Sequence, residues 1–538
     1  MLRRLRDLVG VAATELEAVG VLARAGMLNP RQGLATVAAL RKWKEVTPAG
    51  YAAWASLTPH REAIIDETGS LTFSQVHGRT NAIATGLAEA GVKEGDNVAV
   101  LCRNHRGFVE SAVAVGKLGA DTLFLNTGFA GPALADVLDR EGTSGIIFDE
   151  EFTDLVESYG GDGLRVSAEQ SRHRRYPSLG DLIAEHDNTE PTPPTREGRQ
   201  VILTSGTTGT PKGANRPNPP RLPSTAAALL SRIPYRTGET MVVPAPLFHA
   251  WGLGHLMVAA SGGCCLVLCR RFDAEKTLEL VDRYGATVLA VVPVMLQRIL
   301  GLDTAVINRH DTSTLRIVAS SGAALPGGLA VEWMDTFGDN LYNLYGSTEV
   351  AQATIASPED MRAAPGTAGR PPVGTVVKIL DSAGQEVPQG EIGRIFVGNR
   401  LQFDGYTGGG GKEMVGGLMS TGDMGYVDED GRLFVGGRDD DMIVSGGENV
   451  FPREVEDLLS AYPGVDDVAV IGVDDEEFGQ RLKAFVVQGP GADLSDRSLL
   501  DHVKASLARY KIPREVVFLD ELPRNPTGKV LKRKLREM

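Results

Sequence analysis

The sequence predicts an α/β fold: a large N-terminal domain of two α/β subdomains plus a small β-barrel-like subdomain, and a C-terminal α+β domain. Three observations lead to this prediction. Before residue 340, short apolar runs alternate with helical stretches, as in βα units around a parallel sheet. From Thr367 to Gly437 the chain changes to short strands separated by Gly and Asp turns. A fresh pattern of helices and strands then starts after residue 442.

The strands expected in the first region are apolar runs, and helices such as 81–91 lie between them. The strand runs are NVAVLC, TLFLN, GIIFDE, QVILTS, TMVVPA, CCLVLC, ATVLAVVP and LRIVASS. In the C-terminal region, helices are expected at 452–461 and 499–507, with strands at DVAVIGV, KAFVV and VVFL. A chain of 538 residues is too long for one core. We therefore expect four parts: a lead-in at 1–50, a main domain at 51–437, a connection at 438–442 and a C-terminal domain at 443–538.

Composition excludes several classes of protein. The net charge of −14 argues against a nucleic-acid-binding protein, because it implies no broad basic surface. The apolar share of 42% and the charged share of 23% are close to globular averages. Four cysteines are too few for a disulfide framework, and Cys264, Cys265 and Cys269 lack metal-ligand spacing. We expect buried, reduced thiols in a cytoplasmic protein, and nothing in the sequence indicates an oligomeric state.

The first 26 residues predict an amphipathic helix that begins with Arg3, Arg4 and Arg6. Its uncharged stretch is far shorter than the roughly 20 residues that a membrane span needs. Two interpretations stay open: the helix docks on the protein's own surface, or it lies on an anionic membrane face. In the second case residues 1–26 would make the protein peripheral at the inner membrane face. The apolar positions of the helix are Leu2, Leu5, Val9, Ala12, Leu16, Val19 and Leu22.

The segment LTSGTTGTPKGANR, residues 203–216, places glycines, hydroxyls and a lysine directly after an apolar strand. Glycines let backbone N–H groups approach a ligand closely, and hydroxyls with a lysine suit phosphate oxygens. A Walker A loop needs Gly before its lysine and a hydroxyl after it, whereas Pro211 and Gly213 flank Lys212. A kinase or motor is therefore disfavoured, and another kind of phosphate site is expected. Its candidate residues are Thr204, Ser205, Gly206, Thr207, Thr208, Gly209 and Lys212.

Together with motifs further along, this segment resembles the phosphate loop of the adenylate-forming superfamily, which includes acyl-CoA synthetases, firefly luciferase and peptide-synthetase adenylation domains. The resemblance runs from about Trp54 to Arg536 and points to fatty acyl-CoA synthetases, also called long-chain fatty-acid–CoA ligases. It implies that ATP and Mg²⁺ activate a carboxylic acid as acyl-AMP, releasing pyrophosphate. Coenzyme A then takes the acyl group, and a mobile C-terminal domain serves both steps.

The motif NLYGSTE, residues 343–349, resembles the nucleotide and metal motif of that superfamily. The resemblance implies that Tyr345 stacks on adenine, Asn343 lies near its amino edge, Thr348 contacts the α-phosphate and Glu349 helps to hold Mg²⁺. A hard cation prefers carboxylate oxygen, which agrees with the last role. The other residues implied in ATP or AMP binding are Gly322, Ala323, Ala324, Gly346, Ser347, Asp423 and Arg438.

The stretch from Ser420 to Pro452 carries the most specific resemblance. It implies that Asp423 accepts both ribose hydroxyls, with Arg438 beside it. Asp440 matches the hinge residue about which the C-terminal domain turns. The resemblance also implies a channel for coenzyme A beside Ser445, Gly446 and Gly447.

Lys529, in PRNPTGKVLKRKL, matches the lysine that bridges the acid's carboxylate and the α-phosphate as they react. The attack of a carboxylate on a phosphate brings two anions together, so positive charge is needed there. The catalytic residues that the resemblance implies are Lys529, Thr348, Glu349 and His249.

The motif PLFHAWGLG, residues 246–254, resembles the segment that faces the acyl pocket. His249 stands where amino-acid-activating relatives commonly have an Asp, so an amino acid substrate is disfavoured. Trp251 and Gly252, with the apolar residues that follow, suit an alkyl or aryl acid. The sequence does not indicate chain length or an alkyl over an aryl acid. After Gly213 the chain leaves the family pattern, so no role is implied for residues 214–234.

Alternatives to an acyl-CoA synthetase stay open. A fatty acyl-AMP ligase would pass the acyl group to a carrier protein, although the insertion that some such relatives carry is not evident near residues 438–450. An inactive nucleotide-binding regulator is disfavoured because Lys529, Glu349, Asp423 and Arg438 are all present. A luciferase-like oxygenase is remote, because the fold alone does not confer that chemistry.

Overall fold

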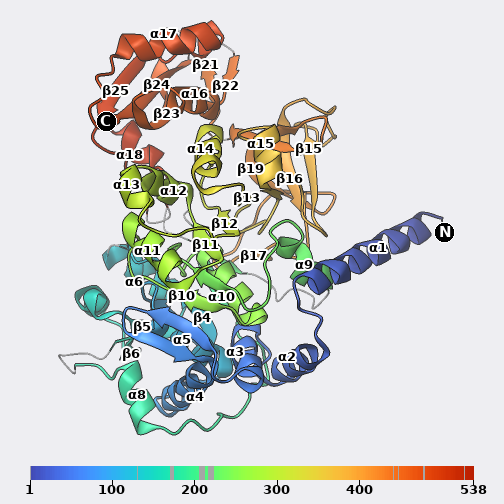
Figure 1. Cartoon of the computed structure of the whole chain (residues 1–538), viewed down its shortest axis with the longest axis vertical. Helices are drawn as coiled ribbons and strands as arrows, with labels where there is room; N and C mark the ends of the chain where they lie inside the picture. Colours follow the sequence, from blue (N-terminus) through green and yellow to red (C-terminus); the bar gives the residue numbers. More distant parts are fainter. Residues whose placement is uncertain are drawn as a thin grey trace. The chain divides into compact units, whose positions relative to one another are not determined.

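The chain forms two compact units in a computed structural model of residues 1–538 (Figure 1). Unit 1 comprises residues 1–291, 298–319 and 400–411, and unit 2 comprises residues 292–297, 320–399 and 412–538. These units do not coincide with the four expected parts, whose boundaries stay predictions. The structure describes residues 2–129, 131–169, 175–204, 212–215, 223–439, 441–445, 448–475, 479–525 and 528–538.

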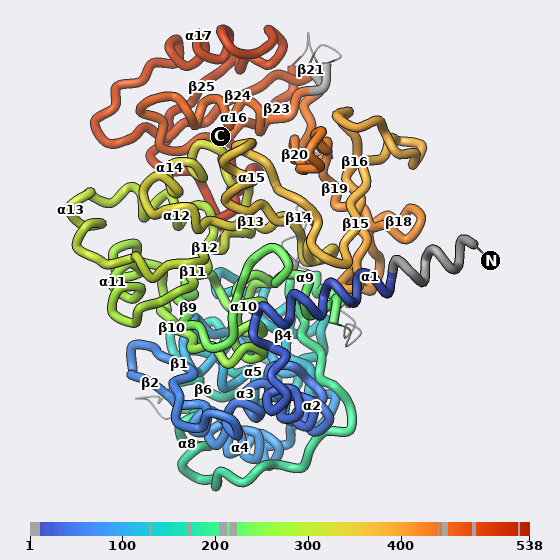
Figure 2. The backbone as a smooth tube through the Cα atoms, turned by 45° about the vertical axis from the view of Figure 1, so that its right-hand side comes forward, coloured from blue at the N-terminus to red at the C-terminus, as the bar shows by residue number. Residues whose placement is uncertain are grey.

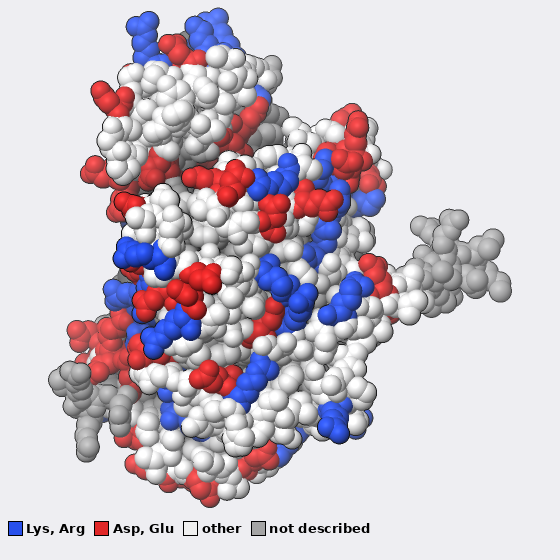
Figure 3. All heavy atoms as spheres, in the orientation of Figure 1, with Lys and Arg blue, Asp and Glu red and all other residues white. Residues whose placement is uncertain are grey.

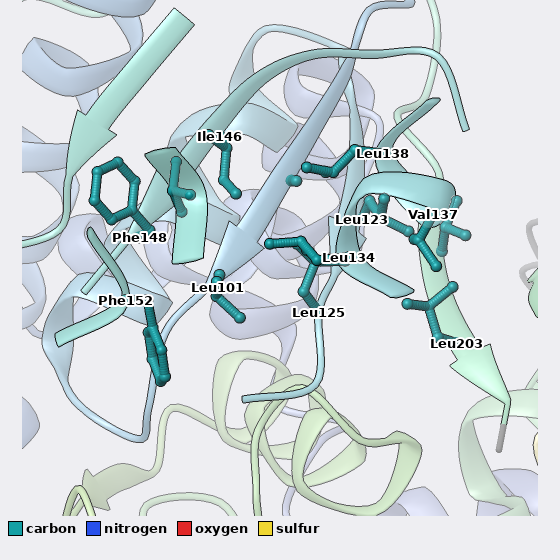
Figure 4. Close-up of a cluster of buried hydrophobic side chains, with 13 residues drawn as sticks. Leu101, Leu123, Leu125, Leu134, Val137, Leu138, Ile146, Phe148, Phe152 and Leu203 are labelled. Atoms are coloured by element: carbon teal, nitrogen blue, oxygen red, sulfur yellow. The ribbon is translucent and has the colours of Figure 1, made fainter. Parts of the chain in front are cut away.

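The first sheet of unit 1 is largely parallel. Parallel pairs join β6 to β5, β5 to β3, β3 to β4 and β4 to β7, and antiparallel pairs add β8 and then β17 at one edge. Leu101 and Leu123 of these strands pack against Leu134 of α6 (Gly131–Arg140) in a buried core (Figure 4). The strands are β3 (Asn97–Leu101), β4 (Asp121–Phe124), β5 (Thr143–Phe148), β6 (Leu164–Ser167), β7 (Gln200–Thr204), β8 (Lys212–Asn215) and β17 (Gly405–Tyr406).

The second sheet of unit 1 has the strand order β12, β11, β9, β10, β1, β2. Its β1, β10, β9 and β11 are paired in parallel, and β2 is antiparallel to β1. All eight apolar runs predicted as strands before residue 340 are strands of these two sheets. The strands of this sheet are β1 (Glu62–Asp66), β2 (Gly69–Thr72), β9 (Thr240–Val242), β10 (Cys265–Val267), β11 (Val288–Val291) and β12 (Ile317–Ser320).

Helices follow most of these strands. The helix expected at 81–91 begins earlier, at Phe73, because Thr72 and Gln75 form a capping box that starts the helix there. The principal helices of unit 1 after the lead-in are α3 (Val46–Leu57), α4 (Phe73–Glu89), α5 (Arg106–Lys117), α8 (Leu179–Glu185), α9 (Pro223–Leu230), α10 (Ala250–Gly262) and α11 (Ala274–Tyr284).

The predicted N-terminal helix is α1 (Leu2–Arg24), which packs beside α9 (Figures 1 and 2). Among the side chains of α1 that are described, residues 11–24, the docked face coincides only partly with the predicted apolar stripe, since Leu22 is half-buried. Ala18 and Val21 are buried, whereas Leu16 is 75% exposed and Val19 is 39% exposed. Glu15 fixes the docking, because its carboxylate accepts hydrogen bonds from the Ser224 hydroxyl (2.6 Å) and backbone N–H (3.0 Å). The helix therefore docks on the protein and leaves Val11, Leu16 and Val19 exposed.

Unit 2 contains an antiparallel pair and a five-stranded antiparallel sheet. The pair is β13 (Leu341–Tyr345) with β14 (Thr354–Ala356). The sheet occupies the region predicted as a small β subdomain, and its central strand β19 pairs with β16, β18 and β20. The strands of the sheet are β15 (Val376–Leu380), β16 (Gly393–Gly398), β18 (Met414–Val415), β19 (Leu418–Val427) and β20 (Leu433–Arg438).

The C-terminal part of unit 2 is the predicted α+β arrangement. Its core is formed by apolar side chains of β23, β24, α16 and α17. The helix expected at 499–507 begins earlier, because Ser495 caps it by accepting from the Ser498 N–H at 3.1 Å. The elements are β21 (Ile443–Ser445), β22 (Glu448–Val450), α16 (Pro452–Ser460), β23 (Val465–Asp475), β24 (Gly479–Gln488), α17 (Asp496–Ser506), β25 (Glu515–Leu519) and α18 (Lys532–Arg536).

The structure also bears on the cysteines, on membrane spanning and on the distribution of surface charge. Cys102, Cys264 and Cys265 are buried free thiols, as predicted, whereas Cys269 is only partly buried. None of the helices within the described ranges has the length and apolar character needed to cross a bilayer. On the face drawn in Figure 3, Lys and Arg side chains are interspersed with Asp and Glu.

Candidate active site

The carboxylate of Asp423 is held by groups from two other strands of unit 2. The register of β19 and β20 places Asp423 opposite Arg438, whose Nη1 lies 3.7 Å from Oδ1. The Tyr345 hydroxyl, at the end of β13, donates to Oδ2 at 2.5 Å. Burial raises the pKa of Asp423, and the Tyr345 hydrogen bond and the positive charges of Arg438 and Lys529 partly oppose that rise. The structure thus brings these four predicted residues into one electrostatic environment.

Asn343, two residues before Tyr345 on β13, is buried. Its side-chain Oδ1 has no hydrogen-bond partner among the described residues. A buried acceptor without a donor costs free energy, so this atom is suited to a ligand that supplies an N–H group. The exocyclic amino group of adenine is such a donor, which agrees with the predicted role of Asn343.

The turn after β13 presents the predicted metal and phosphate residues. Ser347 Oγ accepts hydrogen bonds from the backbone N–H groups of Glu349 (3.2 Å) and Val350 (3.3 Å), which orders the turn. Gly346 is required there, because a Cβ at this position would lie 2.1 Å from the Ala351 carbonyl oxygen. Glu349 and Thr348 are half-exposed and offer hard oxygen donors, a set that fits Mg²⁺.

The segment from Ser320 to Leu325 lies next to β13, because the Ser321 hydroxyl donates to the Leu344 carbonyl at 2.9 Å. Within it, Gly322 and Ala324 are exposed and Ala323 is half-exposed. Gly322 has a φ of +91°, a backbone conformation that favours glycine. Small side chains at these three positions suit a ligand that lies close to the backbone, which agrees with their predicted role in nucleotide binding.

The predicted phosphate loop connects β7 to β8. Thr204 and Lys212, at its two ends, are partners in the antiparallel register of these strands. A Walker A loop leads into a helix, so the strand that follows this loop agrees with the exclusion of that motif. Lys212 is exposed, and its Nζ lies 5.2 Å from the centre of the Tyr406 ring. Outside the described residues lie Ser205, Gly206, Thr207, Thr208 and Gly209.

The predicted acyl-pocket residues lie at the start of α10 in unit 1. His249 is half-buried, and its Nε2 has neither solvent contact nor a hydrogen-bond partner among the described residues. Burial lowers the pKa of His249 to about 4, so the imidazole is neutral at physiological pH. The Trp251 indole donates to the Val291 carbonyl at 3.0 Å. Gly252 permits the close turn, because a Cβ there would lie 2.2 Å from the Pro246 carbonyl oxygen.

Sequence reasoning missed the residue that fixes this segment, Asn104. Its buried side-chain amide donates to the carbonyls of Val243 (3.0 Å) and Ala245 (2.8 Å) and accepts from the Leu247 N–H (2.9 Å). These three bonds hold the chain directly before His249. The available signal was a polar residue close after the buried strand β3, which by itself does not identify its partners.

The residues predicted to form the hinge and the coenzyme A channel are only partly described. Asp440, Gly446 and Gly447 lie outside the described residues. Ser445 is the last residue of β21, and only its backbone is described. Their predicted roles stay predictions.

A cluster that the sequence did not indicate is formed by Cys102, His105 and Asp149, whose ligand atoms lie within 4.8 Å of one another. The His105 Nε2–H donates to Asp149 at 2.6 Å, and His105 Nδ1 accepts from the Gly107 N–H at 3.1 Å. Both ring nitrogens are thus engaged, and burial raises the pKa of the Cys102 thiol well above its usual range. We interpret this cluster as structural, because a metal needs a free imidazole nitrogen and a thiolate.

Two families of known proteins match the chain. The AMP-binding enzyme family matches residues 51–407, and the AMP-binding enzyme C-terminal domain matches residues 454–529. The chain is 32% identical over 493 residues to a fatty acid–acyl-carrier-protein ligase of Streptomyces coeruleorubidus, covering 89% of this chain and 93% of that protein. It is 33% identical over 497 residues to a 2-succinylbenzoate–CoA ligase of Geobacillus sp., covering 90% of this chain and 96% of that protein.

The fold is also similar to a solved structure. The crystal structure of an anthranilate CoA ligase in complex with anthranoyl-AMP superposes with a TM-score of 0.82 at 28% sequence identity. The match covers 91% of this chain and 96% of that chain. Fatty and aromatic acids thus both occur in the names of these similar proteins.

The lowered pKa of His249 predicts a pH dependence of stability. Between its unfolded value of 6.5 and its folded value of about 4, the unfolded chain binds a proton that the folded chain does not. The free energy of unfolding therefore decreases as pH falls through this range. In His249→Gln, we expect the thermal midpoint to fall less between pH 6.5 and 4 than in the unsubstituted protein. The control is His60→Gln, because His60 is exposed. If the thermal midpoint falls between pH 6.5 and 4 by the same amount in His249→Gln as in His60→Gln, the assignment of this pH dependence to His249 is wrong.

Proposed function

This chain belongs to the AMP-binding enzyme family, and we propose that it is an AMP-forming acyl-CoA synthetase for a fatty acid or another apolar carboxylic acid. One observation carries the proposal: the Asp423 carboxylate accepts from Tyr345, faces Arg438 and experiences the charge of Lys529. This arrangement suits a nucleotide whose ribose hydroxyls bind Asp423 and whose phosphates point toward the lysine. A kinase would instead need a site organised around the terminal phosphate.

In the first step, the carboxylate of the acid attacks the α-phosphorus of ATP and pyrophosphate leaves. Positive charge must offset the two anions as they approach, and we assign this task to Lys529 and to the loop from Thr204 to Lys212. Mg²⁺, when held by Glu349, supplies charge compensation for the departing pyrophosphate. Thr348 orients the α-phosphate, and Tyr345 and Asn343 hold the adenine.

In the second step, the thiol sulfur of coenzyme A attacks the acyl carbon and AMP leaves with the bridging oxygen. The thioester forms as the bond from the acyl carbon to that oxygen breaks. The thiol needs the space beside the acyl carbon that Lys529 uses in the first step. We assign the change between the two steps to rotation of the C-terminal domain at Asp440.

The acid is proposed to bind beside His249, Trp251 and Gly252. The supporting observation is that the His249 imidazole is neutral and its Nε2 lacks a partner among the described residues, while the segment carries no carboxylate. Such a surface suits an apolar acyl group and gives no counter-ion for the ammonium of an amino acid. His249 can still donate or accept one hydrogen bond at the carboxyl end of the substrate.

A second candidate function is a fatty acyl-AMP ligase that delivers the acyl group to a carrier protein. The observation that favours it is the 32% identity to a fatty acid–acyl-carrier-protein ligase. The first step is the same, so only the acceptor distinguishes the two enzymes.

We also propose that the enzyme is cytoplasmic and peripheral at the inner membrane face. The lead-in, residues 1–50, contains eight Lys or Arg and only four Asp or Glu, although the whole chain has a net charge of −14. Large apolar side chains on this lead-in are solvent-exposed, which is suited to insertion among lipid headgroups of opposite charge. They lie on α1, on the following loop and on α2 (Pro30–Trp43), and are Val11, Leu16, Val19, Leu28, Leu34 and Val37.

Product analysis tests the proposed reaction. With ATP, Mg²⁺ and a panel of acids, we expect acid-dependent release of pyrophosphate and AMP, and a thioester when coenzyme A is present. Addition of a phosphopantetheinylated carrier protein in place of coenzyme A tests the second candidate.

Lys529→Ala should lower acyl-AMP formation by about 100-fold or more, because charge compensation is lost. The control Lys534→Ala, which removes an exposed lysine of α18, should retain activity. Formation of ADP, or full activity of Lys529→Ala, would contradict the proposal.

Vesicle sedimentation tests the membrane contact. The protein should sediment with vesicles of phosphatidylcholine and phosphatidylglycerol more than with phosphatidylcholine alone. The substitutions Leu16→Glu and Val19→Glu together should abolish this difference, because they place charge on the exposed apolar face. Ile392→Glu is the matched control, since Ile392 is 54% exposed in another region of the chain. Unchanged sedimentation of the double variant would exclude the contact.

A further inference from the structure

The turn that carries Lys529 is tightly hydrogen-bonded, although the lysine side chain itself is exposed. The Asn525 backbone N–H donates to the Lys529 carbonyl and the Gly528 N–H donates to the Asn525 carbonyl, both at 2.9 Å. The Asn525 side-chain oxygen also accepts from the Lys529 N–H at 2.9 Å. A long side chain with four rotatable torsions reaches a defined point only if its backbone is fixed. The position of this turn therefore determines where the Lys529 ammonium can act.

Arg524 connects the turn to the sheet of the C-terminal part. One guanidinium nitrogen, Nη2, donates to both carboxylate oxygens of Asp467 on β23, at 2.8 and 2.6 Å. The other, Nη1, donates to the carbonyl of Gly528, the residue directly before Lys529. Arg524 also forms an antiparallel bridge with Val530, directly after Lys529. One side chain thus joins the lysine's neighbour to a strand of the core sheet.

Asp467 is itself held in place. Its Oδ1 accepts from the Val468 backbone N–H at 3.0 Å, and the carbonyl of Asp466 accepts from the Gln297 side chain. The side chains of Arg524 and Asp467 are 21% and 20% exposed. A half-buried, charge-assisted pair of this kind is screened less by solvent than an exposed pair.

Gly528 also lies close to Val294. Gly528 has a φ of +80°, and a Cβ there would lie 2.7 Å from Val294 Cγ1. Gly528 is therefore held by a polar contact with Arg524 and lies against the apolar side chain of Val294. Removal of the arginine would leave the Gly528 carbonyl without this side-chain donor.

We propose that Arg524, through its ion pair with Asp467, is a positioning residue for Lys529 in the formation of acyl-AMP. This inference rests on the proposed function, which assigns Lys529 to that step. We assign Arg524 no contact with the acid or ATP; it acts by fixing the Gly528 carbonyl, and with it the point from which the Lys529 side chain extends. Because the proposed second step does not use Lys529, Arg524 should matter for the first step and much less for the second.

The test separates the two steps. Acyl-AMP formation is measured as pyrophosphate release without coenzyme A, and thioester formation is measured from added acyl-AMP and coenzyme A. Arg524→Gln should lower the first rate by about 10- to 100-fold and change the second by no more than about twofold. Asp467→Asn should show the same pattern more weakly. Arg524→Lys should restore part of the first rate, because one charged donor remains.

Two controls distinguish positioning from general support of the fold. Arg481 also pairs with carboxylates in the C-terminal part, with Asp475 at 3.8 Å and Glu515 at 3.5 Å. Because neither partner belongs to the turn that carries Lys529, Arg481→Gln should leave both rates unchanged. In a double variant, Arg524→Gln should add little to the loss caused by Lys529→Ala, because the two residues act as a unit.

The inference is overturned if Arg524→Gln lowers both steps equally, behaves like Arg481→Gln, or multiplies the loss caused by Lys529→Ala. The proposed function fails in a different way, namely if Lys529→Ala alone keeps full pyrophosphate release. The two failures are therefore distinguishable in the same set of assays.

Discussion

The half-buried carboxylate of Asp423 is contacted by two other residues predicted to bind the nucleotide, Tyr345 and Arg438. Burial opposes its charge, so the charge depends on the Tyr345 hydroxyl and on the positive charges of Arg438 and Lys529. These partners come from β13, from β20 and from the C-terminal turn. The register of β19 with β20 and the turn held by Arg524 therefore act on the same electrostatic environment. In the proposed reaction, ribose binding at Asp423 and charge compensation by Lys529 are coupled because the two side chains interact electrostatically.

Much of this arrangement could be predicted from the sequence because local patterns report it. Buried parallel strands are continuous apolar runs, and each of the eight runs before residue 340 is a strand. The residues around Lys212 excluded a Walker A loop, in agreement with the strand β8 that follows. The resemblance selected Asp423 and Arg438, and the structure adds the physical reason for their proximity, which is the antiparallel register.

Contacts between distant segments could not be predicted in the same way. The periodicity of α1 predicted an apolar stripe, but not that smaller residues such as Ala18 would dock while Leu16 faced solvent. The pair of Arg524 and Asp467 joins residues 57 positions apart, and neither residue alone differs from an ordinary surface charge in the sequence. Asn104 likewise fixes a segment about 140 positions away. Such partners depend on tertiary packing, which residue spacing does not encode.

In the proposed reaction the acid's own oxygen attacks the α-phosphorus of ATP, and the transfer of an oxygen isotope is the most direct measurement of this step. The acid is labelled with ¹⁸O in both carboxylate oxygens and converted with ATP and coenzyme A. Because AMP leaves with the bridging oxygen, we expect one labelled oxygen in the phosphate of AMP and one in the thioester carbonyl. Label in inorganic phosphate with formation of ADP, or AMP without label, would contradict it.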